Sequence, residues 1–333
     1  MKVLVTGAGG FLGRHLASSL LAQGIDDLRL HFRRKPPVGL LEGLREKYPQ
    51  ARIEPAYANL ANRHGIADMI GDADTIIHAA AGMRGAVADM FANSVIGTRN
   101  LVEGAAAGGV KRIVLVSSFS VYRTGDLPDQ ALLDESTPLE PVGIQNGPYG
   151  FAKTKQEVLF REMQQQHGFE WAIVRPGVIY GPGNAGVSPR VGIRAFGLFF
   201  ALGGSTLLPL THVENCADAI ALVTREAPSG SVYNIVDDDL PTCRAFLADY
   251  RKQVAKLKVV PVPYPLLMAA SKTIAWYHRY SKGQLPGLLP PSIVRSMFRP
   301  LRYSNQALKS LGWRPRIGTR EGLVATFDAM RAK

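Results

Sequence analysis

The sequence predicts an α/β protein in which a parallel sheet is wound with helices on both faces and is followed by a smaller C-terminal lobe. Residues 2–175 alternate short runs rich in Val, Ile and Leu with longer helical stretches. This order is typical of strands joined by crossover helices. The strand runs are mostly apolar, as expected for strands covered on both faces. The pattern loosens after residue 180, where we expect the smaller lobe to begin.

The elements of the sheet follow the chain in order. The expected strands are Lys2–Thr6, Leu28–Phe32, Arg52–Ala56, Thr75–His78, Arg112–Ser117 and Trp171–Arg175, with Val232–Val236 as a later strand. The expected helices are Phe11–Gln23, Arg63–Ile70, Val87–Ala107, Tyr149–His167 and Glu214–Ala227. We therefore assign residues 1–180 to the main domain, with 212–236 returning to it, and residues 181–211 and 237–333 to the smaller lobe.

Length and composition exclude several classes of protein. Of the 333 residues, 46% are hydrophobic, which is enough for a core and excludes a disordered chain. Two cysteines, Cys216 and Cys243, are too few for a disulfide framework or a four-thiolate metal site. We expect no metal and a reducing, cytoplasmic location. No signal peptide is readable, and glycines and a proline interrupt the uncharged stretch Ala195–Val213, so we expect no membrane span.

The positive charge is concentrated at the C-terminus. Residues 244–333 carry 17 Lys and Arg against three acids, whereas the rest of the chain carries 22 basic and 24 acidic residues. Such a lobe attracts a phosphate-bearing substrate, an acidic membrane surface or nucleic acid. The alternative is a solvated basic surface that keeps the protein in solution. Nucleic acid is the partner that we do not expect.

A glycine-rich turn joins the first strand to the first helix. Gly7, Gly10 and Gly13 allow a tight turn, a close approach of the backbone to a pyrophosphate, and close packing of helix on strand. The N-terminus of the helix adds free N–H groups and a partial positive charge. The main domain is therefore predicted to be a Rossmann-type domain that binds a dinucleotide.

The end of the second strand indicates which dinucleotide is bound. NAD enzymes usually have an acid there for the ribose hydroxyls, but this chain has Arg33 and Arg34 and no acid. Guanidinium groups bind a 2′-phosphate, which a carboxylate would repel. We predict NADP as the cofactor, with NAD as the alternative. If neither arginine binds the cofactor, the two side chains only form an exposed basic end of the strand.

Tyr149 and Lys153 lie one helical turn apart if a helix begins near Pro148. A nearby ammonium lowers the pKa of a phenol, and we expect Lys153 together with a cationic nicotinamide to bring the pKa of Tyr149 to about 7. Tyr149 could then exchange a proton with a substrate oxygen. A serine at the carboxyl end of the fifth strand could hold that oxygen; the alternative is a serine that only satisfies a turn.

These motifs together resemble the extended short-chain dehydrogenase/reductase family, which includes NAD(P)-dependent epimerases and dehydratases and 3β-hydroxysteroid dehydrogenase-like enzymes. The resemblance covers nearly the whole chain. It rests on Thr6–Gly13, His78–Ala80, Asn93–Leu101, Tyr149 with Lys153, Arg175–Gly183, His212–Ala219 and Leu311–Pro315.

The resemblance implies roles for individual residues. Ser118 would polarise the substrate oxygen and Tyr149 would act as acid and base. Lys153 would be its partner and a ribose ligand, and Asn93 would belong to a proton relay. Further cofactor contacts are implied for Phe11, Leu12, Asn59, Leu60, Ala79, Ala80 and Pro176, and substrate contacts for Met83, Arg84, Phe119, Tyr122 and Val178. A homodimer through the helices Val87–Ala107 and Tyr149–His167 is also implied.

Departures from the family pattern bear on the substrate. The run Ser118–Ser120 lacks the acids of the sugar dehydratases, so we discount that reaction. Val178 replaces an Asn typical of nucleotide-sugar enzymes, and Leu207–Thr211 lacks their diphosphate-binding Arg. The segment is apolar instead, and it either packs the smaller lobe or lines a pocket for a lipid-like substrate. Its residues are Ile193, Phe196, Leu198, Phe199, Phe200, Leu202, Leu207 and Leu208.

The stretch Tyr264–Tyr280 predicts an amphipathic helix with Lys272 and Arg279 among apolar residues. Packing against the core is the interpretation favoured from the sequence. The alternative is a helix that lies on an anionic membrane, which would make the protein membrane-peripheral.

Three functions follow in order of preference. The first is an NADP(H)-dependent oxidoreductase that interconverts a secondary alcohol and a ketone on a bulky, apolar or phosphate-bearing small molecule. The second is an epimerase of a nucleotide- or lipid-linked sugar, which uses the same residues and retains its cofactor. The third is a non-catalytic NADP sensor or nucleic-acid-binding protein.

Overall fold

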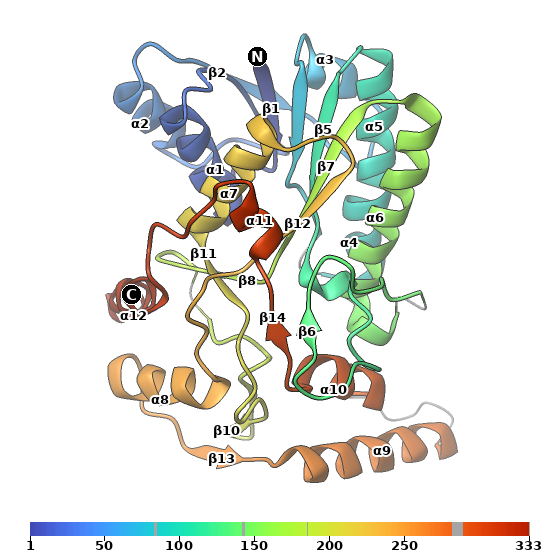
Figure 1. Cartoon of the computed structure of the whole chain (residues 1–333), viewed down its shortest axis with the longest axis vertical. Coiled ribbons are helices and arrows are strands. Elements are labelled where there is room, and N and C mark those ends of the chain that lie inside the picture. The colour runs from blue at the N-terminus through green and yellow to red at the C-terminus, as the bar shows by residue number, and fades with distance from the viewer. Residues whose placement is uncertain (83–84, 142–143, 185, 282–288, 333) are drawn as a thin grey trace.

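The computed structural model describes residues 1–82, 85–141, 144–184, 186–281 and 289–332. A seven-stranded parallel sheet forms its upper half in Figure 1, in the order β12-β7-β5-β4-β1-β2-β3. The strands are β1 (Lys2–Thr6), β2 (Asp27–Phe32), β3 (Arg52–Tyr57), β4 (Thr75–His78), β5 (Arg112–Val116), β7 (Glu170–Pro176) and β12 (Ser231–Ile235). The predicted Rossmann-type fold is confirmed.

Helices cover both faces of the sheet (Figure 1). Alternate residues of a strand point to opposite faces: Val3 and Val5 of β1 lie in one core cluster and Leu4 in the other. The first cluster packs against α1 (Phe11–Ala22), α2 (Leu40–Lys47) and α7 (Val213–Glu226). The second packs against α3 (Ile66–Ile70), α5 (Gly97–Ala107) and α6 (Gly147–His167).

The predicted helix Val87–Ala107 is built from three pieces. These are α4 (Val87–Phe91), one π-helical stretch, η1 (Ala92–Ile96), and α5. A π turn inserts an extra residue into the helical ladder and is common at functional sites. The predicted helix Arg63–Ile70 is shorter, since it begins after Gly65, whose φ is +76°. Helix α2 has no counterpart in the prediction.

The lower part of the molecule is irregular. It contains β8 (Val178–Tyr180) paired with β11 (Leu210–His212), and the hairpin of β9 (Gly192–Ala195) and β10 (Leu198–Ala201) extended by β13 (Val259–Pro261). Short strands β6 (Leu132–Leu133) and β14 (Arg302–Tyr303) also pair. The remaining short turns are η2 (Phe119–Val121) and η3 (Ile144–Asn146). The helices are α8 (Cys243–Gln253), α9 (Tyr264–Tyr280), α10 (Pro291–Phe298), α11 (Gln306–Ser310) and α12 (Thr319–Arg331).

The apolar segment of this part divides between packing and exposure. Phe199, Leu202 and Leu208 are buried in core clusters, whereas Phe196 at the hairpin tip is 96% exposed. The uncharged stretch that includes Leu202 and Leu208 forms strands β10 and β11. Among the described residues, no helix is long and apolar enough to cross a bilayer.

Helix α9 is present with the predicted bounds, but packing against the core accounts for only one side of it. Leu267 and Ser271 are its buried residues. The sequence-based preference for a core-packed helix is therefore wrong for the opposite side, where large side chains stand in solvent.

Candidate active site

The glycine turn lies between β1 and α1 and is tightly packed. Gly7 has φ +73°, and a Cβ there would lie 3.0 Å from the Cα of Ala80. A Cβ on Gly13 would lie 2.2 Å from the carbonyl oxygen of Gly7. Side chains at these two positions would therefore clash with the backbone of the turn. Because both residues are glycines, the turn can close and the N–H groups at the N-terminus of α1 are available for an anion. These residues fit a bound pyrophosphate.

The other predicted cofactor residues surround this turn. Ala79 and Ala80 are half-buried after β4, and the N–H of Ala80 donates to Thr6 Oγ1 at 3.1 Å. Arg33 and Arg34 are exposed just beyond the end of β2. Asn59 is also exposed after β3 and accepts the N–H of Ala61 in a local turn.

A histidine that the sequence analysis did not identify also lies beside the glycine turn. The N–H of Gly7 donates to His31 Nδ1 at 3.3 Å, so His31 Nε2 carries the proton and donates to the carbonyl of Ala58 at 3.0 Å. Burial lowers the pKa of His31. This neutral imidazole connects the glycine turn to the end of β3.

Ser118 and Tyr149 meet at the carboxyl end of the sheet. Ser118 lies two residues after β5, Tyr149 lies in the first turn of α6, and an interaction with Ser118 acts on the pKa of Tyr149. Desolvation raises the pKa of Tyr149, and the Ser118 hydrogen bond only partly opposes this. The prediction that Lys153 lowers the pKa of Tyr149 is therefore not supported by the groups of the chain itself.

Lys153 is buried one turn further along α6. Its Nζ donates to the carbonyl of Val116 at 2.7 Å and to Gln156 Oε1 at 2.6 Å. Burial lowers the pKa of Lys153 to about 7, and the charge of Glu157 opposes the shift. An ammonium has three N–H donors, so these two bonds leave one for a ligand.

A chain of buried hydrogen bonds runs from Lys153 back to the glycine turn. Gln156 Nε2 donates to Thr98 Oγ1 at 2.8 Å, and the Thr98 hydroxyl donates to the carbonyl of Ser94. His78 lies between Thr98 and Thr6, at 2.8 Å from each hydroxyl. Burial and the nearby Lys153 charge lower the pKa of His78 to about 3, so it is neutral.

A buried ion pair lies under the same helix. Glu157 accepts bonds from Arg175 on β7 through both carboxylate oxygens and from the Ser117 hydroxyl at 2.8 Å. Glu157 is 0% exposed and Arg175 3% exposed. Burial acts to raise the pKa of Glu157, but the bonds and charges of Arg175, with Ser117 and Arg161, hold it below its ordinary value.

Asn93 lies in the π turn and faces the cofactor residues. Its Oδ1 accepts from Arg33 at 3.4 Å and its Nδ2 donates to the carbonyl of Asp89 at 2.7 Å. The structure thus brings Asn93 to Arg33. Among the described residues, no hydrogen bond connects Asn93 to Lys153, as the predicted relay would require.

The predicted substrate residues are only partly at the site. Phe119 and Tyr122 are buried in a core cluster, with the Tyr122 hydroxyl donating to Asn234 at 2.6 Å and its ring under Arg175. Burial raises the pKa of Tyr122 to about 12. Both side chains therefore pack in the core, and their assignment as substrate contacts stays a prediction. Val178 is half-buried in β8, and Met83 and Arg84 lie outside the described residues.

Four further predicted cofactor residues lie in or beside the elements that frame the site. Leu60 is buried, and its carbonyl accepts from Asn100 at 2.8 Å. Pro176 is buried at the end of β7. Phe11 and Leu12 form the first turn of α1. These positions fit a role in shaping the site through the backbone.

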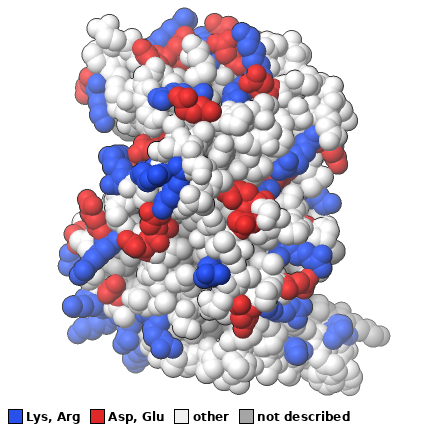
Figure 2. Space-filling model, viewed as in Figure 1, with Lys and Arg blue, Asp and Glu red and all other residues white. Residues whose placement is uncertain are grey.

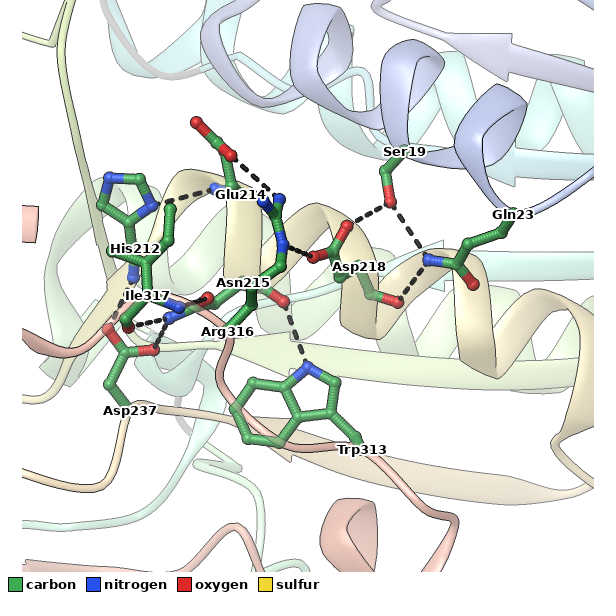
Figure 3. Close-up of polar contacts among 10 residues, drawn as sticks. All are labelled: Ser19, Gln23, His212, Glu214, Asn215, Asp218, Asp237, Trp313, Arg316 and Ile317. Carbon is green, nitrogen blue, oxygen red and sulfur yellow. Dashed lines mark hydrogen bonds and ion pairs between the residues drawn. The ribbon is translucent and has the colours of Figure 1, made fainter.

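The remaining motifs hold the C-terminal segment against the sheet (Figure 3). Asn215 of α7 donates to the carbonyl of Ile317 at 2.8 Å and to Asp237 at 3.1 Å, and its Oδ1 accepts the N–H of Ile317 at 2.9 Å. The indole of Trp313 donates to the carbonyl of Asn215. Arg316 forms ion pairs with Glu214 and Asp218, and Asp218 also accepts a hydrogen bond from Ser19 of α1. The His212–Ala219 and Leu311–Pro315 motifs are therefore partners in one structural contact.

The sequence reasoning missed the groups beneath the site, namely His31, Thr98, Gln156 and the Glu157–Arg175 pair. Two signals were available: Gln156 and Glu157 follow Lys153 by three and four residues on the same helix, and His31 lies in the strand end beside Arg33. Neither spacing shows that the groups are bonded.

Comparison with known proteins is consistent with this geometry. A ketoreductase of Stigmatella aurantiaca, described as acting on 4-hydroxy-2-methyl-3-oxo-4-farnesyl-3,4-dihydroquinoline-1-oxide, is 28% identical, covering 99% of this chain and 96% of that protein. A decarboxylating sterol-4-alpha-carboxylate 3-dehydrogenase of Candida albicans is 25% identical, covering 99% and 97%. The UDP-glucose 4-epimerase of Thermus thermophilus, solved with NAD, has the same fold, with a TM-score of 0.71, 22% identity and 99% coverage of both chains.

The predicted resemblance to the extended short-chain dehydrogenases/reductases is confirmed. Residues 3–236 match the NAD dependent epimerase/dehydratase family, and this match includes the glycine turn, Ser118, Tyr149 and Lys153. The protein therefore belongs to the NAD dependent epimerase/dehydratase family and is an enzyme of the oxidoreductase or epimerase type that uses a nicotinamide cofactor.

Proposed function

We propose that this protein is an NADP(H)-dependent oxidoreductase that interconverts a ketone and a secondary alcohol on a bulky, lipid-like small molecule. The observation that carries the proposal is the placement of Ser118 and Tyr149 together at the carboxyl end of the sheet, one helical turn from buried Lys153. This is the arrangement of donors that a carbonyl oxygen needs when it gains a proton.

Each residue of the chain would have one task. In the reducing direction, Ser118 donates a hydrogen bond to the ketone oxygen and Tyr149 transfers its hydroxyl proton to that oxygen as the alkoxide forms. The remaining N–H of Lys153 would bind the ribose of the cofactor. The nicotinamide, when bound, supplies the hydride to the carbonyl carbon. Asn93 stays a proposed member of the proton relay.

NADP is proposed over NAD because of charge at the end of β2. Arg33 and Arg34 are exposed there, and guanidinium groups bind a phosphate in a bidentate manner. Substitution of both by Ser should raise the KM for NADPH by at least about tenfold, as expected for the loss of two phosphate contacts, and leave the KM for NADH nearly unchanged. Lys111→Ser, on an exposed side chain beyond α5, is the control. Equal changes for both cofactors would contradict the assignment.

A lipid-like substrate is supported by the relatives. Their printed names give a farnesylated quinoline and a sterol carboxylate as substrates, and a 2-alkyl-3-oxoalkanoate reductase of Stenotrophomonas maltophilia is 26% identical over 97% of each chain. All three names describe molecules with a large apolar part, and two of them also carry a carboxylate. The absence of an Arg from Leu207–Thr211 agrees with a substrate without a nucleotide diphosphate.

The test is oxidation of NADPH by the purified full-length chain with a panel of long-chain and polycyclic ketones. Tyr149→Phe should reduce kcat by about a hundredfold or more, whereas Tyr250→Phe, which keeps a packing ring in the smaller lobe, should not. A panel without net cofactor oxidation would refute the proposal.

An epimerase is the second candidate, favoured by the basic lobe, which suits a phosphate-bearing substrate. It predicts cofactor retained through purification and interconversion of sugar epimers without net oxidation. A non-catalytic protein, the third candidate, predicts that Tyr149→Phe has no effect on any function of the protein.

We further propose a homodimer through α4, α5 and α6, a cytoplasmic location, and contact of the basic C-terminal lobe with a membrane.

A further inference from the structure

Helix α9 lies along the base of the molecule, far from the parallel sheet (Figure 1). Its inner side packs on α10 through Leu267, which shares a small core with Val294 and Phe298. The Ser271 hydroxyl on the same side donates to the carbonyl of Leu289 at 2.6 Å. Because these contacts fix the helix from one side, the opposite side faces outward.

The outward side of α9 is apolar and aromatic. Trp276 is 59% exposed, Tyr280 74%, Leu266 61% and Tyr277 44%. The rings of Trp276 and Tyr280 stack at 5.6 Å between centroids. A surface helix of a globular protein normally turns polar residues to solvent, so an apolar outward face indicates that something else covers it.

The segment of the chain that contains this face carries one sign of charge. Residues 250–320 contain 14 Lys and Arg and no Asp or Glu. Lys272 and Arg279 are exposed. Seven residues apart on one helix, they lie along the same edge of the aromatic face, separated by two turns. In Figure 2 the lower edge of the molecule along α9 is largely white, and Lys and Arg gather at the lower left, over α8.

We infer that α9 is a membrane-docking helix whose Trp276, Tyr277, Tyr280 and Leu266 enter the interface of an anionic bilayer while Lys272 and Arg279 contact its head groups. Trp and Tyr favour the membrane interface, and basic side chains beside an apolar helix face are the signature of helices that lie in it. A second copy of the chain is disfavoured, because a two-fold contact would bring basic α9 against basic α9. This inference deepens the proposed membrane contact.

The docked face is connected to the candidate active site. Helix α10 packs against α9 on one side and against η3, which directly precedes α6 and Tyr149, on the other. On the proposed function, a lipid-like ketone would therefore reach the site from the bilayer on which α9 rests. The docking itself does not depend on the reaction.

The experiment measures binding of the full-length chain to vesicles without substrate or cofactor. We expect cosedimentation with mixed phosphatidylglycerol–phosphatidylcholine vesicles, weakened by added salt, and little with phosphatidylcholine alone. Fluorescence should move to shorter wavelength on binding, because Trp276 is exposed, whereas Trp313 is buried and Trp171 is half-buried in β7.

Matched variants localise the contact. Trp276→Ser/Tyr280→Ser should weaken binding by about tenfold or more, through lost apolar burial. Lys272→Gln/Arg279→Gln should weaken it by roughly twenty-five-fold, on the order of fivefold per charge. The controls are Val38→Ser and Tyr57→Ser, exposed apolar side chains of the nucleotide-binding half, which should leave binding unchanged. All six positions are exposed, so these variants should fold.

Three outcomes would overturn the inference. The first is no binding to anionic vesicles, and the second is equal binding by the α9 variants and the controls. The third is that Trp276→Ser/Tyr280→Ser loses self-association but still binds vesicles, which would assign the face to a second copy of the chain. NADPH oxidation in detergent solution, measured in parallel, shows whether the proposed reaction fails separately.

Discussion

Replacing Glu157 by Gln tests whether the core under α6 depends on one buried carboxylate. Glu157 binds Arg175, Ser117 and Arg161 and is fully buried. Gln keeps the shape and one acceptor oxygen, but it removes the charge and turns an amide N–H₂ toward the guanidinium. Arg175 then remains buried without a counter-ion.

The magnitude follows from that unpaired charge. Removing one partner of a buried ion pair typically costs about 3–5 kcal/mol, and the 3% exposure of Arg175 leaves no solvent to compensate. The loss should depend on pH. The folded pKa of Glu157 lies below its ordinary value of 4.5, so its stabilisation is present above pH 4.5 and is lost as pH falls through the folded pKa. Wild type and variant should therefore converge in acid.

Urea unfolding at neutral pH, followed by circular dichroism, measures the effect. Glu162→Gln, an exposed acid of the same helix, is the control and should change the free energy of unfolding by less than about 0.5 kcal/mol. A loss below about 1 kcal/mol for Glu157→Gln, as for an exposed ion pair, would refute the claim that the pair is desolvated. So would a loss that is constant down to strong acid.

Three further predictions concern the site and its support. Gly13→Ala places a Cβ 2.2 Å from the Gly7 carbonyl, so calorimetric titration should show at least about a tenfold loss of NADPH affinity. Gln156→Leu removes an acceptor from the Lys153 ammonium, which lowers the Lys153 pKa. The limb of the kcat/KM profile near pH 7 should therefore move about one unit toward acid. An unchanged profile would contradict this coupling. Burial raises the pKa of Asp237 to about 6, so its contribution to stability falls as pH rises from about 4 to 6; Asp237→Asn should flatten that part of the stability curve, and a curve of unchanged slope would count against it.

The fold could be predicted from the sequence because its signals are local and repeated. Strands such as Lys2–Thr6 are apolar runs of the right length, and Gly7 and Gly13 occur where a strand gives way to a helix. The pair of Tyr149 and Lys153 could be identified because both lie on one helix, at a spacing that places them on the same face.

Features that depend on distant parts of the chain were not predictable in this way. Tyr122 follows β5 like a site residue, but it is buried because Asn234 and Arg175 come from other strands. Helix α9 has the composition of a core helix, and only the position of α10 shows which of its sides is left outside. The π turn that carries Asn93 leaves no mark in the hydrophobic period.

The hydrogen-bond chain under the site explains why Lys153 can be buried as a cation. The Thr98 hydroxyl donates to a main-chain carbonyl, so it must accept from Gln156, and the Gln156 oxygen is thereby turned toward Lys153. His78 must in turn keep its proton on Nε2 to donate to the same hydroxyl, leaving Nδ1 to accept from Thr6, whose residue opens the glycine turn. With the Thr98 proton directed to the Ser94 carbonyl, these bonds follow one direction. A shift of the glycine turn would therefore disturb the acceptor of the ammonium, which couples the cofactor-binding loop to the residue beside Tyr149 through the interior of the protein.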